Sequence, residues 1–247
     1  MYMKKVLLII ISFFIIITCI YYMLPNKVAV LGYHSFTNGN SDSDMVINKD
    51  KFENQLKFLK KHNFKSLTLD EMNCYMEKKC KIKKNTVLIT MDDGYLDNYD
   101  IAFPLLKKYG FNGVVFIVGR AVNDNSDGLF NKDYIEKTKK EYPNIEFASH
   151  GYDLHEIDTT NYKYDDYIND IKLQEKILNT KYIAYPHGDY NEDFINALKD
   201  NNYKLAFGFG PDFRKSSNKD NKYIIPRLSI NGGMPMWKFK LRLLMPF

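Results

Sequence analysis

The chain has 247 residues, of which 45% are hydrophobic and 26% charged, and its formal net charge is +5. This composition excludes a disordered polar chain and a protein that crosses a membrane many times, and the length suffices for one sizeable core. The excess of positive charge is spread over scattered lysines and is not interleaved with aromatic residues, so we expect no nucleic-acid partner.

The first 25 residues differ from the rest. A lysine pair precedes an uncharged run from Val6 to Leu24, which at about 1.5 Å per residue just spans a bilayer core of about 30 Å. Lysines before such a run favour a cytoplasmic N-terminus. We therefore expect residues 1–25 to form one transmembrane anchor helix in the cell membrane, and residues 26–247 to form one extracytoplasmic domain. The alternative is a secreted protein with a cleaved signal, but no small-x-small cleavage pattern follows the run.

Short apolar, β-branched runs alternate with stretches of helical spacing in the rest of the chain. The runs predicted as strands are Val28–Leu31, Val87–Thr90, Val114–Val118, Ile145–Ala148, Tyr182–Tyr185 and Lys204–Phe207. The residues with helical spacing between them are Phe52, Leu56 and Leu59, then Ile101, Leu105 and Leu106, then Ile168, Ile171 and Leu178, then Phe194 and Leu198. This alternation predicts a parallel α/β fold, either barrel-like or an open sheet.

Local signals predict where several elements begin and end. Gly110 follows two lysines and a tyrosine as a helix stop would, and residues 189–191 offer N-cap candidates before Phe194. Residues 121–133 and 216–221 are rich in small polar residues and are expected to form surface loops.

Two of the three cysteines, Cys74 and Cys80, lie in the body of the chain, in a lysine-rich stretch without a nearby histidine. Outside the cell they could form a disulfide. The alternative is a pair of free surface thiols, and we expect no metal role for them.

Each polar cluster directly follows one of the predicted strands. The clusters are Tyr33-His34, Asp92-Asp93-Gly94, His150 with His155, and Pro186-His187-Gly188. Because the carboxyl ends of parallel strands carry the active site in α/β folds, the four clusters are expected to converge.

The acidic and histidine clusters suit a metal site. Two neutral imidazoles, His150 and His155, with one carboxylate form a set that binds Zn²⁺ or another divalent first-row ion and leaves positions open. Such an ion promotes amide or ester hydrolysis, and a second carboxylate would then serve as the base; Asp92 and Asp93 supply both parts. The structural alternatives are a helix cap or turn for Asp-Asp-Gly and surface or core positions for the histidines.

The order of these motifs resembles the polysaccharide deacetylases of carbohydrate esterase family 4. The motifs are Thr-Met-Asp-Asp-Gly-Tyr, then Ser-His with a second His five residues on, then Tyr-Pro-His-Gly. The ordered match covers residues 86–192, and the segments 31–34 and 226–230 extend it. The resemblance implies a distorted (β/α) barrel of the NodB-homology type and an N-deacetylase activity.

Position by position, the resemblance implies Asp92 as the general base, with Asp93, His150 and His155 as ligands of a divalent ion. Zn²⁺ is expected, with Co²⁺, Ni²⁺ and Fe²⁺ as the alternatives.

The turn of Pro186, His187 and Gly188 resembles the family's groove wall, whose backbone N–H, here that of His187, helps to stabilise the oxyanion. This chain departs from the family twice. Ala184 stands where many members carry the arginine that orients the base, and no histidine follows His187, so the late catalytic histidine is absent.

His34 is our candidate for the missing acid. Its context, Leu-Gly-Tyr-His-Ser-Phe, resembles the branch that de-N-acetylates poly-β-1,6-N-acetylglucosamine, in which the motif order is permuted. We expect His34 to protonate the leaving amine near its unperturbed pKa of about 6.5. The alternative is a structural histidine in a turn.

Together these inferences predict a metal-dependent hydrolase that removes N-acetyl groups from N-acetylglucosamine units of a cell-surface polysaccharide, namely the poly-β-1,6-linked polymer of biofilm matrix. An association with the machinery of polymer synthesis or export would fit this role. The alternatives are a peptidoglycan or chitin-oligomer deacetylase, a metal-independent glycoside hydrolase, and a catalytically inactive glycan-binding protein that retains the metal site.

Overall fold

The computed structural model describes Val6, Ile11, Ser12 and residues 26–155, 161–209 and 214–245. The expected anchor, residues 1–25, therefore lies almost entirely outside the described residues. Among the described residues, no helix combines the length and the apolar character needed to cross a membrane.

The main sheet consists of parallel strands that nearly close into a barrel. Its strands are β1 (Val28–Tyr33), β4 (Lys65–Ser66), β5 (Thr86–Met91), β6 (Gly113–Ile117), β7 (Ile145–Ser149), β8 (Tyr182–Ala184), β9 (Leu205–Gly208), β10 (Ile225–Pro226) and β11 (Leu228–Ser229). Their order is β10-β9-β8-β7-β6-β5-β1-β11, with β4 beside β5. The two outermost strands, β10 and β11, are separated in the chain by Arg227 alone, so the sheet returns to its own edge. The distorted (β/α) barrel is confirmed.

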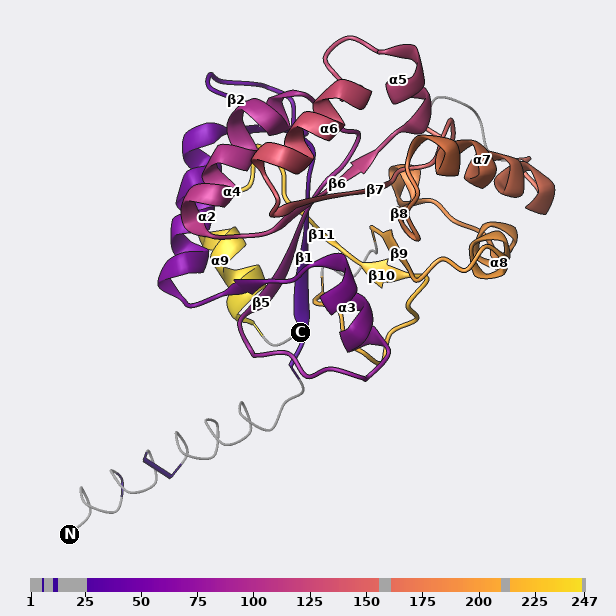
Figure 1. Ribbon diagram of the computed structural model, residues 1–247. Helices are drawn as coiled ribbons and strands as arrows, with labels where there is room; N and C mark the ends of the chain where they lie inside the picture. The colour runs from indigo at the N-terminus through magenta and orange to yellow at the C-terminus, as the bar shows by residue number, and fades with distance from the viewer. Residues whose placement is uncertain (1–5, 7–10, 13–25, 156–160, 210–213, 246–247) are drawn as a thin grey trace.

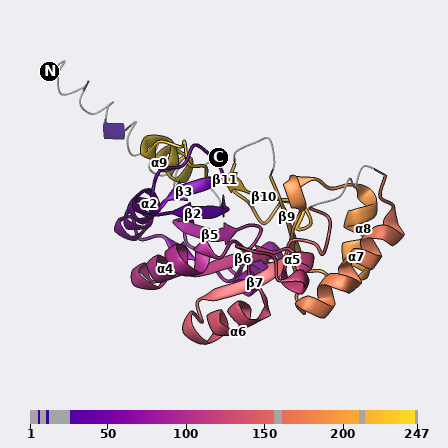
Figure 2. The ribbon, with the colours of Figure 1, turned by 90° about the horizontal axis from the view of Figure 1, so that it is seen from above.

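Helices surround the strands (Figure 1). They are α2 (Lys49–Lys61), α3 (Leu69–Met76), α4 (Phe103–Tyr109), α5 (Gly119–Asp124), α6 (Lys132–Glu141), α7 (Tyr164–Ile177), α8 (Glu192–Asp200) and α9 (Met236–Leu244), with a π-turn η1 (Asn98–Ala102) and a 3-10 turn η2 (Pro186–Gly188). A separate two-stranded sheet pairs β2 (Ser35–Thr37) with β3 (Val46–Asn48). Seen from above, α2 and α9 lie across the barrel from α7 and α8 (Figure 2).

Helix ends follow the local sequence. The side chain of Asn48 accepts hydrogen bonds from the first turn of α2, and the side chain of Asn191 accepts one from the Phe194 N–H of α8 at 2.8 Å. Gly110 ends α4 in the left-handed conformation, with φ 72°. The predicted stop and the predicted N-cap are therefore confirmed.

The prediction of a surface loop over residues 121–133 is wrong at both ends. The chain is helical up to Asp124, because the apolar side chains of α5 are buried and Asn125 ends the helix only there, with φ 52°. The next helix, α6, begins at Lys132, capped by the side chain of Asn131. Only the last four residues of α5 and the first two of α6 fall within the predicted loop, and such short stretches show no hydrophobic repeat.

The alternation of side chains along the strands divides the core in two. On β1, Ala29 and Leu31 pack toward the surrounding helices, whereas Val28 and Val30 join a cluster to which most strands of the barrel contribute. Helix α3 contributes to this inner cluster, and a disulfide joins Cys74, within α3, to Cys80, which follows the helix.

Candidate active site and metal centre

Asp92 lies at the carboxyl end of β5 on the inner face of the barrel. Leu88 belongs to the inner cluster, so a side-chain period of two directs Thr90 and Asp92 inward as well. The Asp92 N–H donates to the carbonyl of Tyr33 at 2.9 Å, which continues the pairing with β1. Asp92 is only 1% exposed, and a carboxylate this deeply buried requires a partner.

Arg227 is that partner. Its Nη1 donates to Asp92 Oδ1 at 2.6 Å and its Nη2 donates to Asp92 Oδ2 at 2.8 Å, with a further contact from Nη1 to Thr90 Oγ1 at 3.3 Å. The guanidinium lies 4.1 Å from the centroid of the Phe209 ring. Burial raises the pKa of Asp92, but the charge and hydrogen bonds of Arg227, together with the nearby His150 and His34, lower it further, so this pKa lies below its usual range.

Arg227 is the functional residue that sequence reasoning missed. Ala184 stands at the position expected for a base-orienting arginine, and Arg227, between β10 and β11, supplies a guanidinium to Asp92 instead. The available signal was a single arginine within the apolar segment 224–230. A charged residue in such a segment is rarely buried without a pairing role.

Asp93 points away from Asp92 because the backbone turns sharply here. Asp93 has φ 67° and Gly94 has φ 78°, both in the left-handed region. A Cβ on Gly94 would lie 3.0 Å from Cγ2 of Ile117, so this turn requires glycine. The two adjacent carboxylates therefore have different environments and can have different roles.

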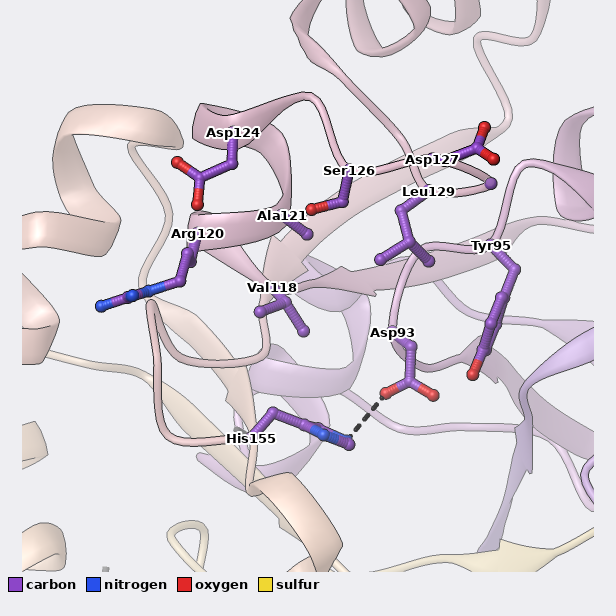
Figure 3. A pocket seen from close by; sticks show the side chains of 11 residues that line it. Asp93, Tyr95, Val118, Arg120, Ala121, Asp124, Ser126, Asp127, Leu129 and His155 are labelled. Carbon is purple, nitrogen blue, oxygen red and sulfur yellow. Dashed lines mark ion pairs between the residues drawn. The ribbon is translucent and has the colours of Figure 1, made fainter. Parts of the chain in front are cut away.

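Asp93 faces His150 and His155. Asp93 Oδ1 lies 3.4 Å from Nε2 of His150 and 3.1 Å from Nε2 of His155, and Figure 3 shows the carboxylate and the His155 ring approaching each other. Burial raises the pKa of Asp93, but the hydrogen bonds and positive charge that the two imidazoles provide when protonated lower it further, so this carboxyl is ionised. One ligand atom from each of the three residues lies within 4.8 Å of the others.

This donor set fits a divalent ion. Nδ1 of His150 lies 2.8 Å from the carbonyl of Ala184, so a neutral His150 donates there and presents the lone pair of Nε2 to Asp93. Two hydrogen-bond acceptors, His150 Nε2 and Asp93 Oδ1, then face each other. Asp93 Oδ1 is buried without a hydrogen-bond donor from the described residues. A cation among the three residues resolves this arrangement.

His34 lies beside the Asp92–Arg227 pair. Its Nε2 is 3.9 Å from Asp92 Oδ2, its ring stacks on Phe209, and Asn98 donates to its carbonyl at 2.9 Å. Burial lowers the pKa of His34, although the nearby carboxylates partly oppose this. The expectation of an unperturbed pKa is therefore wrong, because the side chain is only 13% exposed.

The turn at Pro186–Gly188 borders the metal-ligand cluster. His187 has φ 56°, and its ring lies 4.3 Å from that of His155. The two hydrogen bonds that close the turn come from the N–H groups of Gly188 and Asp189. Neither bond uses the His187 N–H. The predicted oxyanion role requires that this N–H is not used to close the turn.

A cavity of about 360 Å³ opens beside Asp93 and His155 (Figure 3). Its other lining residues come from the segment after β5, from α5 with its N-cap residue, and from the loop that follows α5; they are Tyr95, Val118, Arg120, Ala121, Asp124, Ser126, Asp127, Gly128 and Leu129. The sequence did not reveal this cavity. The predicted residues thus converge at the carboxyl edge of the barrel, next to a space large enough for a sugar ring.

Known proteins share these features. A sequence profile described as polysaccharide deacetylase matches residues 79–206, which are 128 of the 247 residues. The chain is 32% identical over 214 residues to the poly-beta-1,6-N-acetyl-D-glucosamine N-deacetylase of Staphylococcus aureus (strain N315), an alignment that covers 79% of this chain and 71% of that protein.

Two solved structures share the fold. The Streptococcus pyogenes deacetylase PplD in complex with acetate has a TM-score of 0.78 at 22% identity, covering 90% of this chain and 100% of that one. IcaB from Ammonifex degensii has a TM-score of 0.74 at 22% identity, covering 90% and 98%. At this identity the two structures establish the fold alone. With the profile match and the staphylococcal relative, the chain belongs to the polysaccharide deacetylase family, and it is an N-deacetylase of carbohydrate esterase family 4.

Proposed function

We propose that this N-deacetylase is metal-dependent and releases acetate from N-acetylglucosamine units of poly-β-1,6-N-acetylglucosamine. One observation carries the proposal: a buried, ionised carboxylate, Asp92, lies beside the cluster of Asp93, His150 and His155 at the mouth of the barrel. The name of the staphylococcal relative supports this polymer and linkage.

The cluster would hold one divalent ion, for which Zn²⁺ is our first candidate and Co²⁺, Ni²⁺ and Fe²⁺ are alternatives. Bound there, the ion would polarise the acetamide carbonyl and acidify a water molecule.

The remaining steps belong to residues of the chain. Asp92 accepts a proton from the attacking water, and the two hydrogen bonds from Arg227 fix the plane of its carboxylate. The His187 N–H donates a hydrogen bond to the developing oxyanion. Protonated His34 donates to the leaving nitrogen as the C–N bond breaks, so the products are acetate and a free amine.

The cavity beside Asp93 would seat the sugar. Val118, Ala121 and Leu129 give it an apolar wall, while Tyr95 lies at one side (Figure 3). Sugars present both apolar faces and hydroxyl groups, so a wall of this kind with polar residues at its rim suits a hexosamine.

We further propose that the domain works outside the cytoplasm, tethered by residues 1–25. The uncharged run from Val6 to Leu24 supports the tether. The disulfide between Cys74 and Cys80 supports an oxidising compartment. Freed amines there would make the polymer cationic and adhesive. An association with the machinery of polymer synthesis or export would fit this location.

Acetate release from defined β-1,6 and β-1,4 oligomers tests this proposal on the purified protein. Asp92→Asn and His34→Gln should each lower kcat by about 10²–10⁴-fold. His62→Gln is the matched control, because His62 caps the far end of α2 and should keep full activity. A chelator should abolish acetate release, and added Zn²⁺ should restore it.

Three results would overturn the proposal. Unchanged acetate release by both Asp92→Asn and His34→Gln would remove these residues from the mechanism. Chain cleavage without acetate would indicate a glycoside hydrolase. Polymer binding by the wild-type protein without acetate release would indicate an inactive binding protein.

A further inference from the structure

Helix α9 exposes an apolar stripe. Trp237 is 67% exposed, and Leu241 and Leu244 are each 49% exposed. At about 100° per residue, these three side chains fall within about 60° of one another. They lie on the side of the helix away from Phe239 and Leu243, which are buried in the core. The helix thus has two apolar faces, one packed on the domain and one turned to solvent.

Two lysines flank this stripe. Lys238 and Lys240 are exposed, and the helical repeat places them on opposite sides of the stripe. Tryptophan and leucine on one face with lysines beside them is the pattern of helices that lie in the headgroup region of a bilayer. Lysine side chains at such a boundary can extend toward phosphate groups while their stems remain in the apolar layer.

The stripe lies close to the point where the N-terminal segment joins the domain. Val28, at the start of β1, exchanges two backbone hydrogen bonds with Ser216, each of 2.8 Å. The neighbouring Lys215 donates through Nζ to the carbonyl of Leu243 at 2.6 Å. The last turn of α9 is therefore beside the entry of β1, and the uncharged run that precedes the domain ends at Leu24.

We propose that α9 lies in the headgroup region of an anionic lipid bilayer, with Trp237, Leu241 and Leu244 embedded and the two lysines facing lipid phosphates. The helix has nine residues, so at about 1.5 Å per residue it cannot cross a bilayer and acts only at the surface. Since α9 packs along α2 on the outside of the barrel, the outer surface of the barrel at α9 would face the membrane.

Tryptophan fluorescence tests this, because Trp237 is the only tryptophan of the chain. The full-length protein is reconstituted into vesicles of phosphatidylcholine and phosphatidylglycerol, with or without lipids brominated at shallow acyl positions. We expect blue-shifted emission, strong quenching by the brominated lipids, and weak quenching by aqueous iodide. Lys238→Gln and Lys240→Gln should each lower the ratio of docked to undocked helix about fivefold.

A matched control moves the tryptophan to another helix and keeps an aromatic side chain at position 237. The double variant Trp237→Phe, Leu173→Trp places the only tryptophan on α7, where Leu173 is 40% exposed. Because α7 lies across the barrel from α9 (Figures 1 and 2), this tryptophan should remain accessible to iodide and unquenched by brominated lipid. Quenching confined to position 237 supports the proposal.

Other outcomes overturn it. Trp237 that stays accessible to iodide in vesicles, or equal quenching at both positions, would mean that α9 does not contact lipid. A blue shift that depends on protein concentration but not on brominated lipid would assign the stripe to a second copy of the chain. A blue shift independent of both would assign it to the protein's own N-terminal segment.

Discussion

Replacing Arg227 by methionine would leave Asp92 buried without its cation. Asp92, which is 1% exposed in the wild-type protein, would lose two hydrogen bonds, of 2.6 and 2.8 Å. Removing one partner of a buried ion pair costs about 3–5 kcal/mol, because the remaining charge cannot be solvated. We therefore expect Arg227→Met to lower the free energy of unfolding at pH 7 by about that amount.

The pH dependence of this stability loss shows whether the buried charge of Asp92 causes it. In the native protein the pKa of Asp92 lies below its ordinary value of 3.8, so its contribution to stability is present above about pH 4 and is lost as the pH falls through the folded pKa. Without Arg227, burial dominates and the pKa rises. The pH dependence of the Asp92 contribution then changes sign, and the variant loses stability as the pH rises through the new pKa. The difference between the two proteins should thus be large at pH 7 and shrink in acid.

Urea unfolding of Arg227→Met, Asp92→Asn and the double variant measures the coupling. We expect the double variant to recover most of the loss, with a coupling free energy of about 3 kcal/mol. Arg214→Met is the control, because the pair of Arg214 with Asp220 is partly exposed, with 38% of the arginine side chain accessible, and should cost about 1 kcal/mol or less. A loss at Arg227 no larger than at Arg214, or strictly additive losses, would refute the reasoning.

Three further predictions concern the same edge of the barrel. Gly94→Ala should destabilise the protein by about 1–3 kcal/mol in thermal unfolding, because it combines a positive φ with a Cβ close to Ile117. His150→Ala should weaken Zn²⁺ binding by at least about 100-fold in calorimetry, since one ligand is lost. Burial raises the pKa of Asp170 from 3.8 to about 6, so its effect on stability, about 3 kcal/mol, is favourable below pH 4 and is lost as the pH rises through 6. Asp170→Asn should remove this change from the stability curve.

Each of these has its own check. Gly128 also has a positive φ, of 74°, but no neighbour within 4 Å of a Cβ, so Gly128→Ala must cost less than Gly94→Ala if the clash with Ile117 matters. Zn²⁺ affinity that survives His150→Ala would exclude His150 as a ligand. An unchanged stability curve between pH 4 and 6 in Asp170→Asn would mean that another group titrates there.

The convergence of the candidate site residues could be predicted because its signals are local. Asp92, Asp93 and His150 each follow directly on an apolar run that forms a strand, and strand direction alone brings them to one edge. Their convergence with His34 needed only the inference that the sheet is parallel.

The partner of Asp92 could not be predicted in the same way. Arg227 is 135 residues from Asp92 in sequence, and the strands on either side of it, Ile225–Pro226 and Leu228–Ser229, are too short to show a period of two. The contact exists only because the sheet curls back on its own edge. Burial shifts such as that of His34 are equally invisible, because they depend on what packs over a side chain.

The position of Arg227 between β10 and β11 also affects the order in which parts of the site form. In the chain Arg227 follows β1 and the strands from β5 to β9, so it is synthesised after all of them. Until it arrives, the strands that carry Asp92 and the histidines can form, but Asp92 has no buried guanidinium to keep it ionised. The Asp92–Arg227 pair thus forms only when the barrel has closed, and a chain that ends before Arg227 would carry the other candidate site residues with Asp92 lacking this partner.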